Sequence, residues 1–150
     1  MIKGVVVREA PYSTDSRGWL LKAVPKDYVR ESPFGEIYLS SAIPGEIKGC
    51  HYHDDTTEWF CVIQGEGTLH LEDIESGEKM TLNMSRGNRL SVEIPPRVAH
   101  AISNERDEEL ILLAFADVPY DPENPDSYPW DFSRVAKDLK DRKEFDARNE

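Results

Sequence analysis

The chain has 150 residues, of which 39% are hydrophobic and 31% are charged, and its formal net charge is −11. This length and composition are typical of one globular domain and exclude a disordered chain. A surface this acidic would repel the phosphates of nucleic acid and of an anionic bilayer, so we expect no nucleic-acid or membrane partner.

The start of the chain does not indicate export. The first residues, MIKGVVVREAPYS, lack the charged start, the long apolar run and the cleavage site of a signal peptide. No later run approaches the roughly 20 apolar residues of a membrane span. Two cysteines, Cys50 and Cys61, are too few for a disulfide scaffold. We therefore expect a cytoplasmic protein.

From residue 2 to residue 116 the sequence alternates between short apolar segments and turns such as SPFG, QGEG and SRGN. Ten strand-like segments with no long helical period indicate an all-β sandwich or barrel. Parallel strands joined by crossover helices are excluded, because such connections need a dozen or more residues. The predicted strands cover residues 2–8, 19–24, 36–43, 47–53, 58–63, 68–73, 79–84, 89–94, 98–103 and 109–116.

The C-terminal part of the sequence has a different character. The segment ADVPYDPENPDSYPW contains four prolines and predicts an extended path across the barrel surface. The last twenty residues predict a helix with an apolar stripe of Val135, Leu139 and Phe145, and a frayed, solvated tail is the alternative. The expected division is a barrel domain over 1–128 and a helical tail over 129–150.

A candidate metal site lies near the middle of the sequence. His51 and His53 are two residues apart in a predicted strand, so both imidazoles face the same side of the sheet. Glu58 begins the next strand, and a facing strand about 5 Å away brings its carboxylate within reach. His100 adds a third imidazole from a later strand. This set suits one divalent transition metal (Fe, Mn, Ni, Co or Zn) with one or two positions left open.

The alternative for each of these histidines is an ordinary polar or surface residue, which is the commoner role of a single histidine in a strand. The fourth histidine, His70, fits that interpretation, because it alternates with Thr68 and Glu72 and is expected to be exposed. The other three fall into one arrangement with a suitably placed glutamate, which favours metal binding for the set.

These residues resemble the two sequence motifs of the cupin superfamily. The spacing of the first motif is met by Gly45, His51, His53, Glu58 and Gly65. The second motif is met by Pro95, His100 and Asn104, with Arg97 in place of a glycine. The resemblance implies a jelly-roll β-barrel with the ion inside. We therefore expect an all-β cupin barrel with a short C-terminal helix.

A narrower resemblance is to dTDP-4-dehydrorhamnose 3,5-epimerase and its sugar-nucleotide relatives. It rests on Asp15-Ser-Arg17-Gly18-Trp19, on IKGCHYH and on IPPRVAHAI. It implies that His51 is the base that removes a proton beside the sugar's keto group if the site holds no metal. The family's catalytic lysine falls at Glu58 and its acid tyrosine near Leu113, so that mechanism is incomplete in this chain.

The same departures match a second group of relatives, the metal-motif cupin domains that end some capsular-polysaccharide sugar reductases and epimerases. The similar stretches are GCHYHDDTTEWFCVIQGEG, IPPRVAHAISN and the segment Asn124–Tyr128. Both resemblances imply nucleotide-sugar or polysaccharide metabolism.

A nucleotide sugar as substrate requires cations for its diphosphate. Arg17, Lys48 and Arg97 are the basic residues within the matching motifs, and Arg17 is the first choice because its guanidinium binds phosphate as a fork. Trp19 or Tyr52 is expected to stack on a base or sugar ring. The alternative is that Arg17 pairs with Asp15 and that Trp19 is a core residue.

The strand predicted over 58–63, EWFCVI, is apolar on both faces and must be covered twice. A homodimer whose sheets pack across this strand is the simplest cover. The N-terminal strand or the C-terminal helix is the alternative cover.

Three functions follow from these observations. The first is a metal-assisted epimerase or isomerase of a nucleotide-linked 4-keto-6-deoxy sugar, with Asp54 and Asp55 as possible bases. The second is a non-catalytic module that binds a sugar or another small ligand. The third is an iron-dependent oxygenase.

Overall fold

Short apolar and alternating segments form twelve strands and two helices in the computed structural model, which describes residues 1–150. The strands are β1 (Val6–Glu9), β2 (Tyr12–Asp15), β3 (Gly18–Leu21), β4 (Glu36–Ala42), β5 (Ile47–Tyr52), β6 (Glu58–Gln64), β7 (Glu66–Asp73), β8 (Lys79–Ser85), β9 (Leu90–Ile94), β10 (Val98–Ser103), β11 (Leu110–Ala116) and β12 (Tyr128–Pro129); the helices are α1 (Lys26–Val29) and α2 (Ser133–Arg148).

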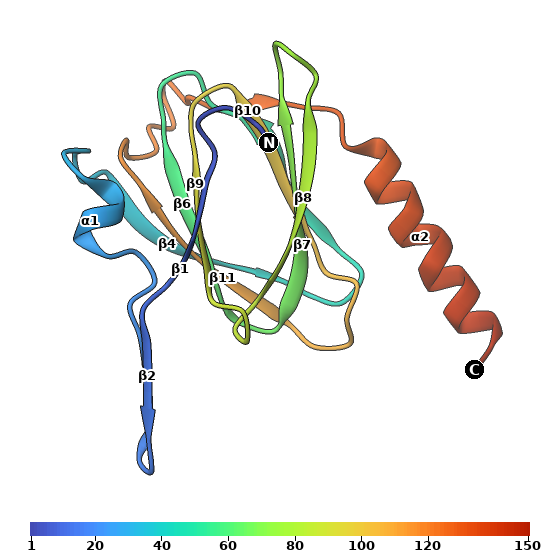
Figure 1. Cartoon of the computed structure of the whole chain (residues 1–150). Helices are drawn as coiled ribbons and strands as arrows, with labels where there is room; N and C mark the ends of the chain where they lie inside the picture. Colours follow the sequence, from blue (N-terminus) through green and yellow to red (C-terminus); the bar gives the residue numbers. More distant parts are fainter.

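Ten of the strands form two five-stranded sheets that face each other as the two walls of a barrel (Figure 1). Their orders are β1-β9-β6-β11-β4 and β12-β5-β10-β7-β8, and every pair is antiparallel. The third sheet is a hairpin of β2 and β3 that projects from the barrel (Figure 1). The predicted all-β class with a C-terminal helix is confirmed.

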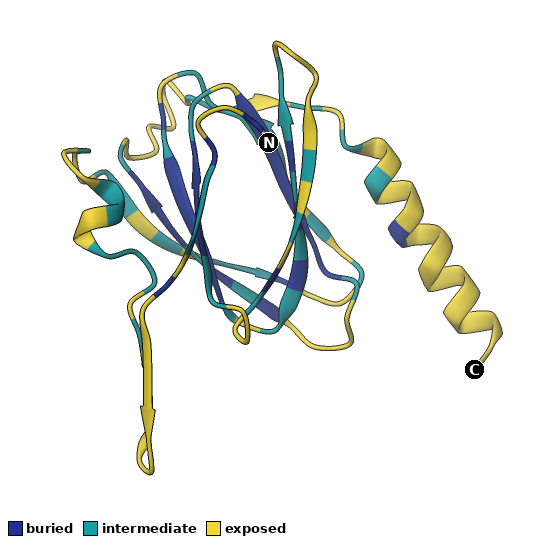
Figure 2. Cartoon of the chain, viewed as in Figure 1, coloured by how far each residue is buried: buried dark blue, intermediate teal, exposed yellow.

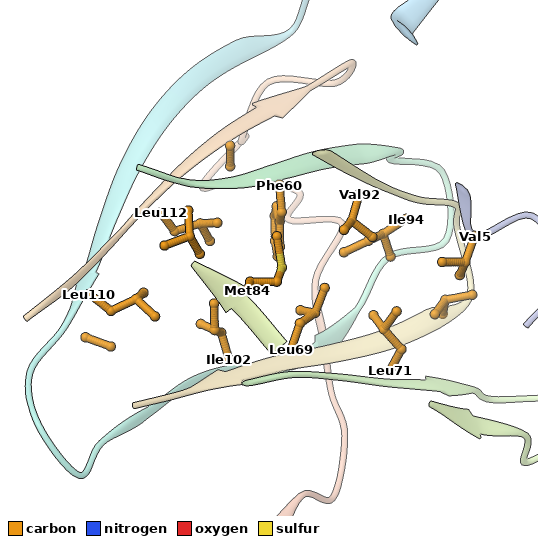
Figure 3. Close-up of a cluster of buried hydrophobic side chains, with 14 of the residues drawn as sticks. Val5, Phe60, Leu69, Leu71, Met84, Val92, Ile94, Ile102, Leu110 and Leu112 are labelled. Carbon is orange, nitrogen blue, oxygen red and sulfur yellow. The ribbon is translucent and has the colours of Figure 1, made fainter. Parts of the chain in front are cut away.

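The space between the two sheets holds the core. Fifteen buried apolar residues form one cluster, to which both walls contribute (Figure 3). Phe60 and Val92 extend from the first sheet, and Leu69 and Ile102 extend from the second (Figure 3). Truncating a buried leucine of this kind to alanine costs about 2–5 kcal/mol, so the cluster fixes the spacing of the two walls.

The eight strands predicted after residue 35 agree with the structure within two residues at each end, the first two agree only in part, and β2 was not predicted. Residues 2–5 form a turn that inserts Ile2 and Val5 into the core, so the apolar run belongs to a strand only from Val6. Strand β3 ends at Leu21, shortly before Pro25, and its partner β2 is fully exposed. An exposed strand carries no apolar alternation from which to predict it.

Strand β6, which is apolar on both faces, is covered on its outer face by other segments of the same chain. Trp59 and Cys61, on its outer side, are 1% and 0% exposed. The Trp59 indole donates a hydrogen bond to the carbonyl of Tyr28 in α1, and its ring packs against Phe115, which also contacts Phe34. The segment around α1 therefore covers this face. The predicted covers of this face, by a second copy, the N-terminal strand or the C-terminal helix, are therefore not needed, and the homodimer itself stays a prediction.

Helix α2 contacts the barrel through only a narrow strip of its surface. Leu139 is buried and Val135 half-buried, whereas Phe145 is 66% exposed, so the predicted stripe is only partly used. Figure 2 shows that α2 and the β2–β3 hairpin are the most exposed parts of the chain. The predicted helix is formed, in place of a frayed tail. Neither helix is long and apolar enough to cross a membrane.

Candidate metal centre

Four side chains from three strands converge inside the barrel. His51 lies on β5, His53 directly follows it, Glu58 opens β6 and His100 lies within β10. One ligand atom from each of them lies within 4.8 Å of the others. The convergence that the sequence predicts for these residues is therefore present in the fold.

A β-bulge sets the orientation of His51. His100 pairs with His51 but the next residue, Ala101, pairs with Gly49, so Cys50 is an extra residue on β5. Gly49 and Cys50 both have positive φ, 96° and 56°. A Cβ at Gly49 would lie 3.0 Å from the carbonyl oxygen of His100, an unusually tight contact, and the positive φ also favours glycine here. The bulge places His51 opposite His100.

Hydrogen bonds to carbonyl oxygens fix the tautomers of two imidazoles. His53 Nδ1 bonds to the carbonyl of Asp126, and His100 Nδ1 lies 3.1 Å from the carbonyl of Val98. A carbonyl only accepts, so each ring donates from Nδ1 and, when neutral, carries its lone pair on Nε2.

The tautomer of His51 is less strictly set. Its Nδ1 lies 3.3 Å from the hydroxyl of Ser127. A hydroxyl either donates or accepts, so this contact permits the same tautomer without imposing it.

The centre of the cluster contains acceptors without a matching donor. The Nε2 atoms of His53 and His100 lie 3.3 and 3.2 Å from the same oxygen, Oε2 of Glu58. The buried His100 Nε2 has no hydrogen-bond partner. Neutral imidazole lone pairs that face a carboxylate oxygen require a cation between them, either a proton or a metal ion. The donor set, imidazole nitrogen with one carboxylate, fits a divalent transition metal.

Tyr38 on β4 completes the environment of Glu58. Its hydroxyl donates a 2.8 Å hydrogen bond to Oε1 of Glu58, which leaves Oε2 facing the two histidines. Burial, together with the charge of Glu58 and this hydrogen bond, raises the pKa of Tyr38 far above its usual value. Tyr38 therefore stays protonated and acts as a donor at any physiological pH.

The charges of the cluster favour a bound cation. Burial and the neighbouring His100 and His53 lower the pKa of His51 to about 4, so His51 is neutral at pH 7. Burial also opposes a charge on His53, but the hydrogen bond to Glu58 and its charge raise the pKa of His53 above its usual value. The pKa of Glu58 is far below normal because His100 and His53 outweigh the effect of its burial. The carboxylate is therefore ionised.

Two cavities meet at the cluster. The larger, about 310 Å³, opens from His51, His53 and Glu58 past Glu36 and Asp126. The smaller, about 170 Å³, lies in the barrel, and its lining includes Lys48, Phe60 and Ile102. Both are lined by Tyr38 and His51.

Among the predicted substrate-binding residues, Lys48 lines the smaller cavity, and its ammonium forms no ion pair. Arg17 and Trp19 lie on the β2–β3 hairpin, which points away from the barrel (Figure 1). Arg17 pairs with Asp15 at 2.7 Å, as the alternative interpretation expects. Trp19 is 47% exposed, with the guanidinium of Arg86 over its ring, so it is not a core residue.

Arg97, Asp54 and Asp55 lie outside the cluster. Arg97 forms ion pairs with Asp54 at 2.7 Å and Glu75 at 2.9 Å on the surface. Asp54 and Asp55 line neither of the two cavities at the cluster. The structure therefore brings together the four predicted ligands and separates them from the two predicted bases.

Sequence reasoning missed three residues of this site: Tyr38, Asp126 and Ser127. Tyr38 lies between the exposed residues Ile37 and Leu39. The more polar Tyr38 therefore points into the barrel while its apolar neighbours point outward, the reverse of the usual pattern. Asp126 and Ser127 lie in the Pro-Asp-Ser-Tyr segment, whose resemblance to metal-motif relatives was the available signal.

Two facing antiparallel sheets with a His-x-His, Glu and His set between them define a barrel of the cupin class, as the sequence predicts. More narrowly, the chain belongs to the polysaccharide biosynthesis C-terminal domain family, whose model matches residues 13–128.

Two known proteins are similar to this chain in sequence. It is 30% identical over 138 residues to the spore coat polysaccharide biosynthesis protein SpsL of Bacillus subtilis, which covers 87% of this chain and 91% of that protein. It is 28% identical over 120 residues to a UDP-2-acetamido-2,6-beta-L-arabino-hexul-4-ose reductase of Pseudomonas aeruginosa, covering 80% of this chain but only 31% of the reductase.

Among solved structures, a dTDP sugar isomerase of Desulfovibrio desulfuricans G20 superimposes with a TM-score of 0.79 at 24% identity, over 87% of this chain and 85% of that one. The distant relatives are thus nucleotide-sugar enzymes and proteins of polysaccharide biosynthesis.

Proposed function

We propose that the chain binds one divalent transition metal through His51, His53, Glu58 and His100 and acts at this site as an epimerase or isomerase of a nucleotide-linked 4-keto-6-deoxy sugar. The observation that carries the proposal is the convergence of two Nε2 atoms on one carboxylate oxygen, with the buried His100 Nε2 left unpartnered. The names of the relatives support the substrate class.

When bound, a divalent ion supplies Lewis-acid stabilisation of the enediolate that forms as an α-proton leaves a keto sugar. The residues of the chain prepare the site for this chemistry. His51 is neutral, Tyr38 donates to Oε1 of Glu58, and Phe60 forms part of the apolar wall of the smaller cavity.

The role of His51 separates two versions of the proposal. A neutral imidazole has one lone pair, so His51 is either a metal ligand or the base of a metal-free epimerase. We favour the ligand role, because the family's lysine is replaced by the carboxylate of Glu58. We do not assign the base to Asp54 or Asp55, because Asp54 pairs with Arg97 and neither residue lines the cavities at the cluster.

For the diphosphate of the substrate we propose Lys48, which lines the smaller cavity without an acidic partner. The larger cavity is an unsuitable path for phosphate, because Glu36, Glu58 and Asp126 line it. Lys48→Ala is therefore expected to raise KM for a nucleotide sugar while leaving metal content unchanged.

We further propose a homodimer, with an interface that differs from the one expected from β6. Ile37, Leu39 and Ile43 along β4, and Trp19 and Leu20 on the hairpin, are all at least 47% exposed. We propose that a second copy of the chain covers these apolar side chains. In such a dimer the hairpin would bring Arg17 and Trp19 to the metal centre of the partner subunit. Light scattering that gives the mass of a monomer at micromolar concentration would contradict this.

One observation favours the non-catalytic alternative. The chain corresponds to 31% of the length of the reductase, and the epimerase family's lysine and tyrosine positions are Glu58 and a residue near Leu113. A module that only binds a sugar would have the same cluster without turnover.

The test combines metal analysis with proton exchange. Protein purified without added metal is analysed for elements, and a 4-keto-6-deoxy nucleotide sugar is incubated with it in deuterated water. We expect about one equivalent of metal and deuterium beside the keto group, both lost in His100→Ala. Metal without deuterium incorporation would favour the binding module, and no metal in the presence of excess Fe, Mn, Ni and Zn would overturn the proposal.

A further inference from the structure

The segment between β11 and α2 crosses the opening of the metal centre. Its strand β12 pairs with the end of β5, with Tyr128 opposite Tyr52 and Pro129 opposite His51. Asp126 and Ser127, just before β12, line the larger cavity beside the cluster. This segment, more than 70 residues away in sequence, therefore lies directly against His51 and His53.

Asp126 makes four hydrogen bonds there, all to the short stretch that carries His53 toward Glu58. Oδ1 accepts from the backbone N–H of Asp54 at 2.7 Å, and Oδ2 accepts from the N–H of Asp55 at 2.9 Å and the hydroxyl of Thr56 at 2.8 Å. Its backbone carbonyl accepts from His53 Nδ1. One residue therefore holds both the His53 ring and the connector that leads to Glu58.

This pairing needs a carboxylate. The three donors use both oxygens, and two of them are backbone N–H groups that cannot turn away. An asparagine has one acceptor oxygen and would point its own NH₂ at a second donor. An alanine would leave all three donors without Asp126, although its backbone carbonyl would remain.

We infer that Asp126 is the positioning residue of the metal centre. By fixing residues 53–56 it holds His53, with its lone pair on Nε2, and Glu58 in the arrangement that receives the ion, before the ion binds. This inference rests on the proposed metal site and extends it to a segment outside the ligand strands. Groups that orient metal ligands in this way typically change metal affinity by about 10–100-fold when they are replaced.

A purely structural role is the competing explanation, and the chain offers a matched control. Asp73 also accepts two backbone N–H groups in a turn, from Glu75 at 2.9 Å and Ser76 at 3.2 Å, and it is not one of the cluster residues. Both donors bond to the same oxygen, Oδ1, which an asparagine would keep, so the matched control is Asp73→Ala. It removes turn contacts of the same kind as Asp126→Ala without touching a metal ligand.

The experiment titrates Co²⁺ into the metal-free full-length protein and follows both the dissociation constant and the visible absorption spectrum of the bound ion. We expect Asp126→Asn to weaken Co²⁺ binding about 10-fold and Asp126→Ala up to about 100-fold, with an altered spectrum for both. Asp73→Ala should retain the wild-type constant and spectrum. Thermal unfolding of the metal-free proteins measures the stability that Asp126→Ala and Asp73→Ala each lose.

A second measurement does not require the metal. The ¹⁵N shifts of His53 in the metal-free protein report which ring nitrogen carries a proton. We expect Nδ1 of His53 to stay protonated in the wild type and in Asp73→Ala. In Asp126→Ala we expect the ring to become mobile, because the side-chain bonds that hold the Asp126 carbonyl against His53 are lost.

The outcomes separate this inference from the function beneath it. If the wild type binds no Co²⁺, the proposed metal function is overturned. If the wild type and both Asp126 variants bind Co²⁺ with the same constant and spectrum, the inference alone is overturned. Should Asp126→Ala fold poorly, the milder Asp126→Asn decides between these results.

Discussion

Two histidines on adjacent strands of one sheet, His100 on β10 and His70 on β7, lie in opposite environments. His70 Nε2 lies 2.8 Å from the hydroxyl of Ser103, which itself donates to Glu105. Because the proton of Ser103 is used, His70 must be the donor and carries its proton on Nε2. His100 instead donates from Nδ1, and its buried Nε2 has no partner.

His100 is buried, and His70 is half-buried rather than exposed as the sequence predicts. The comparison teaches that the hydrogen bonds of each ring nitrogen separate a structural histidine from a candidate ligand. Both side chains are held in the same sheet, but only His100 leaves a lone pair unmatched beside an ionised carboxylate. An unmatched buried acceptor is unfavourable unless a cation fills the gap. Substitutions at the two positions should therefore have different consequences.

Removing His100 should have the largest effect. His100→Ala deletes one of four ligands and is expected to weaken Co²⁺ binding by at least about 100-fold, since the remaining three groups no longer enclose the ion. Isothermal titration with chelator competition measures the change. Wild-type affinity in this variant would remove the distinction between the two histidines.

Tyr38→Phe tests the support of the carboxylate. The variant removes the 2.8 Å hydrogen bond to Oε1 of Glu58 and leaves a buried charged oxygen without its donor. We expect about 10-fold weaker metal binding and a loss of about 1–3 kcal/mol in the free energy of unfolding. Urea unfolding of metal-free protein gives the second value, and an unchanged midpoint would show that Tyr38 does not hold Glu58.

Gly49→Ala tests the bulge that turns His51 toward His100. A Cβ here would lie 3.0 Å from the carbonyl of His100, at a φ of 96° that disfavours any side chain. The expected cost is about 1–3 kcal/mol, with a smaller loss of metal affinity than in His100→Ala. Gly77→Ala is the matched control, because its φ of 75° is also positive but no atom lies near its Cβ position. Equal losses in both variants would show strain alone.

The pH dependence of the free energy of unfolding should change sign when the metal binds. In the metal-free protein the pKa of His53 is raised by Glu58, so its contribution to stability is complete below the unfolded value of about 6.5 and is lost as pH rises through the folded pKa. Metal binding requires the neutral ring, so Co²⁺ affinity should increase over the same range. Unfolding with and without Co²⁺ between about pH 6 and pH 8 measures both slopes, and parallel slopes would contradict the assignment.

The sequence predicts the site best where a regular strand fixes which side each residue faces. The alternation of His51 and His53, the start of β6 at Glu58 and the strand of His100 were enough to predict that the four proposed ligands lie together, although the bulge at Cys50 was not predicted. The rest of the site depends on contacts between residues that are far apart in the sequence, and no local sequence pattern predicts such contacts. Asp126 reaches His53 across 73 residues, and Tyr38 faces inward between exposed apolar neighbours. The hairpin that carries Arg17 and Trp19 away from the barrel was missed for a different reason, because an exposed strand such as β2 has no apolar alternation.

The smallest effect is expected at His70, and it sharpens the comparison most. In His70→Gln the side-chain amide can still donate to Ser103, so the chain from His70 through Ser103 to Glu105 keeps its direction. The free energy of unfolding should fall by less than about 1 kcal/mol, and Co²⁺ binding should remain unchanged. His70→Ala, which leaves the buried hydroxyl of Ser103 without this donor, should lose about 1–2 kcal/mol and still bind Co²⁺ as the wild type does. A loss of metal affinity in either variant would mean that the two environments are coupled through the sheet, and that the unpartnered nitrogen of His100 is not sufficient to mark the metal centre.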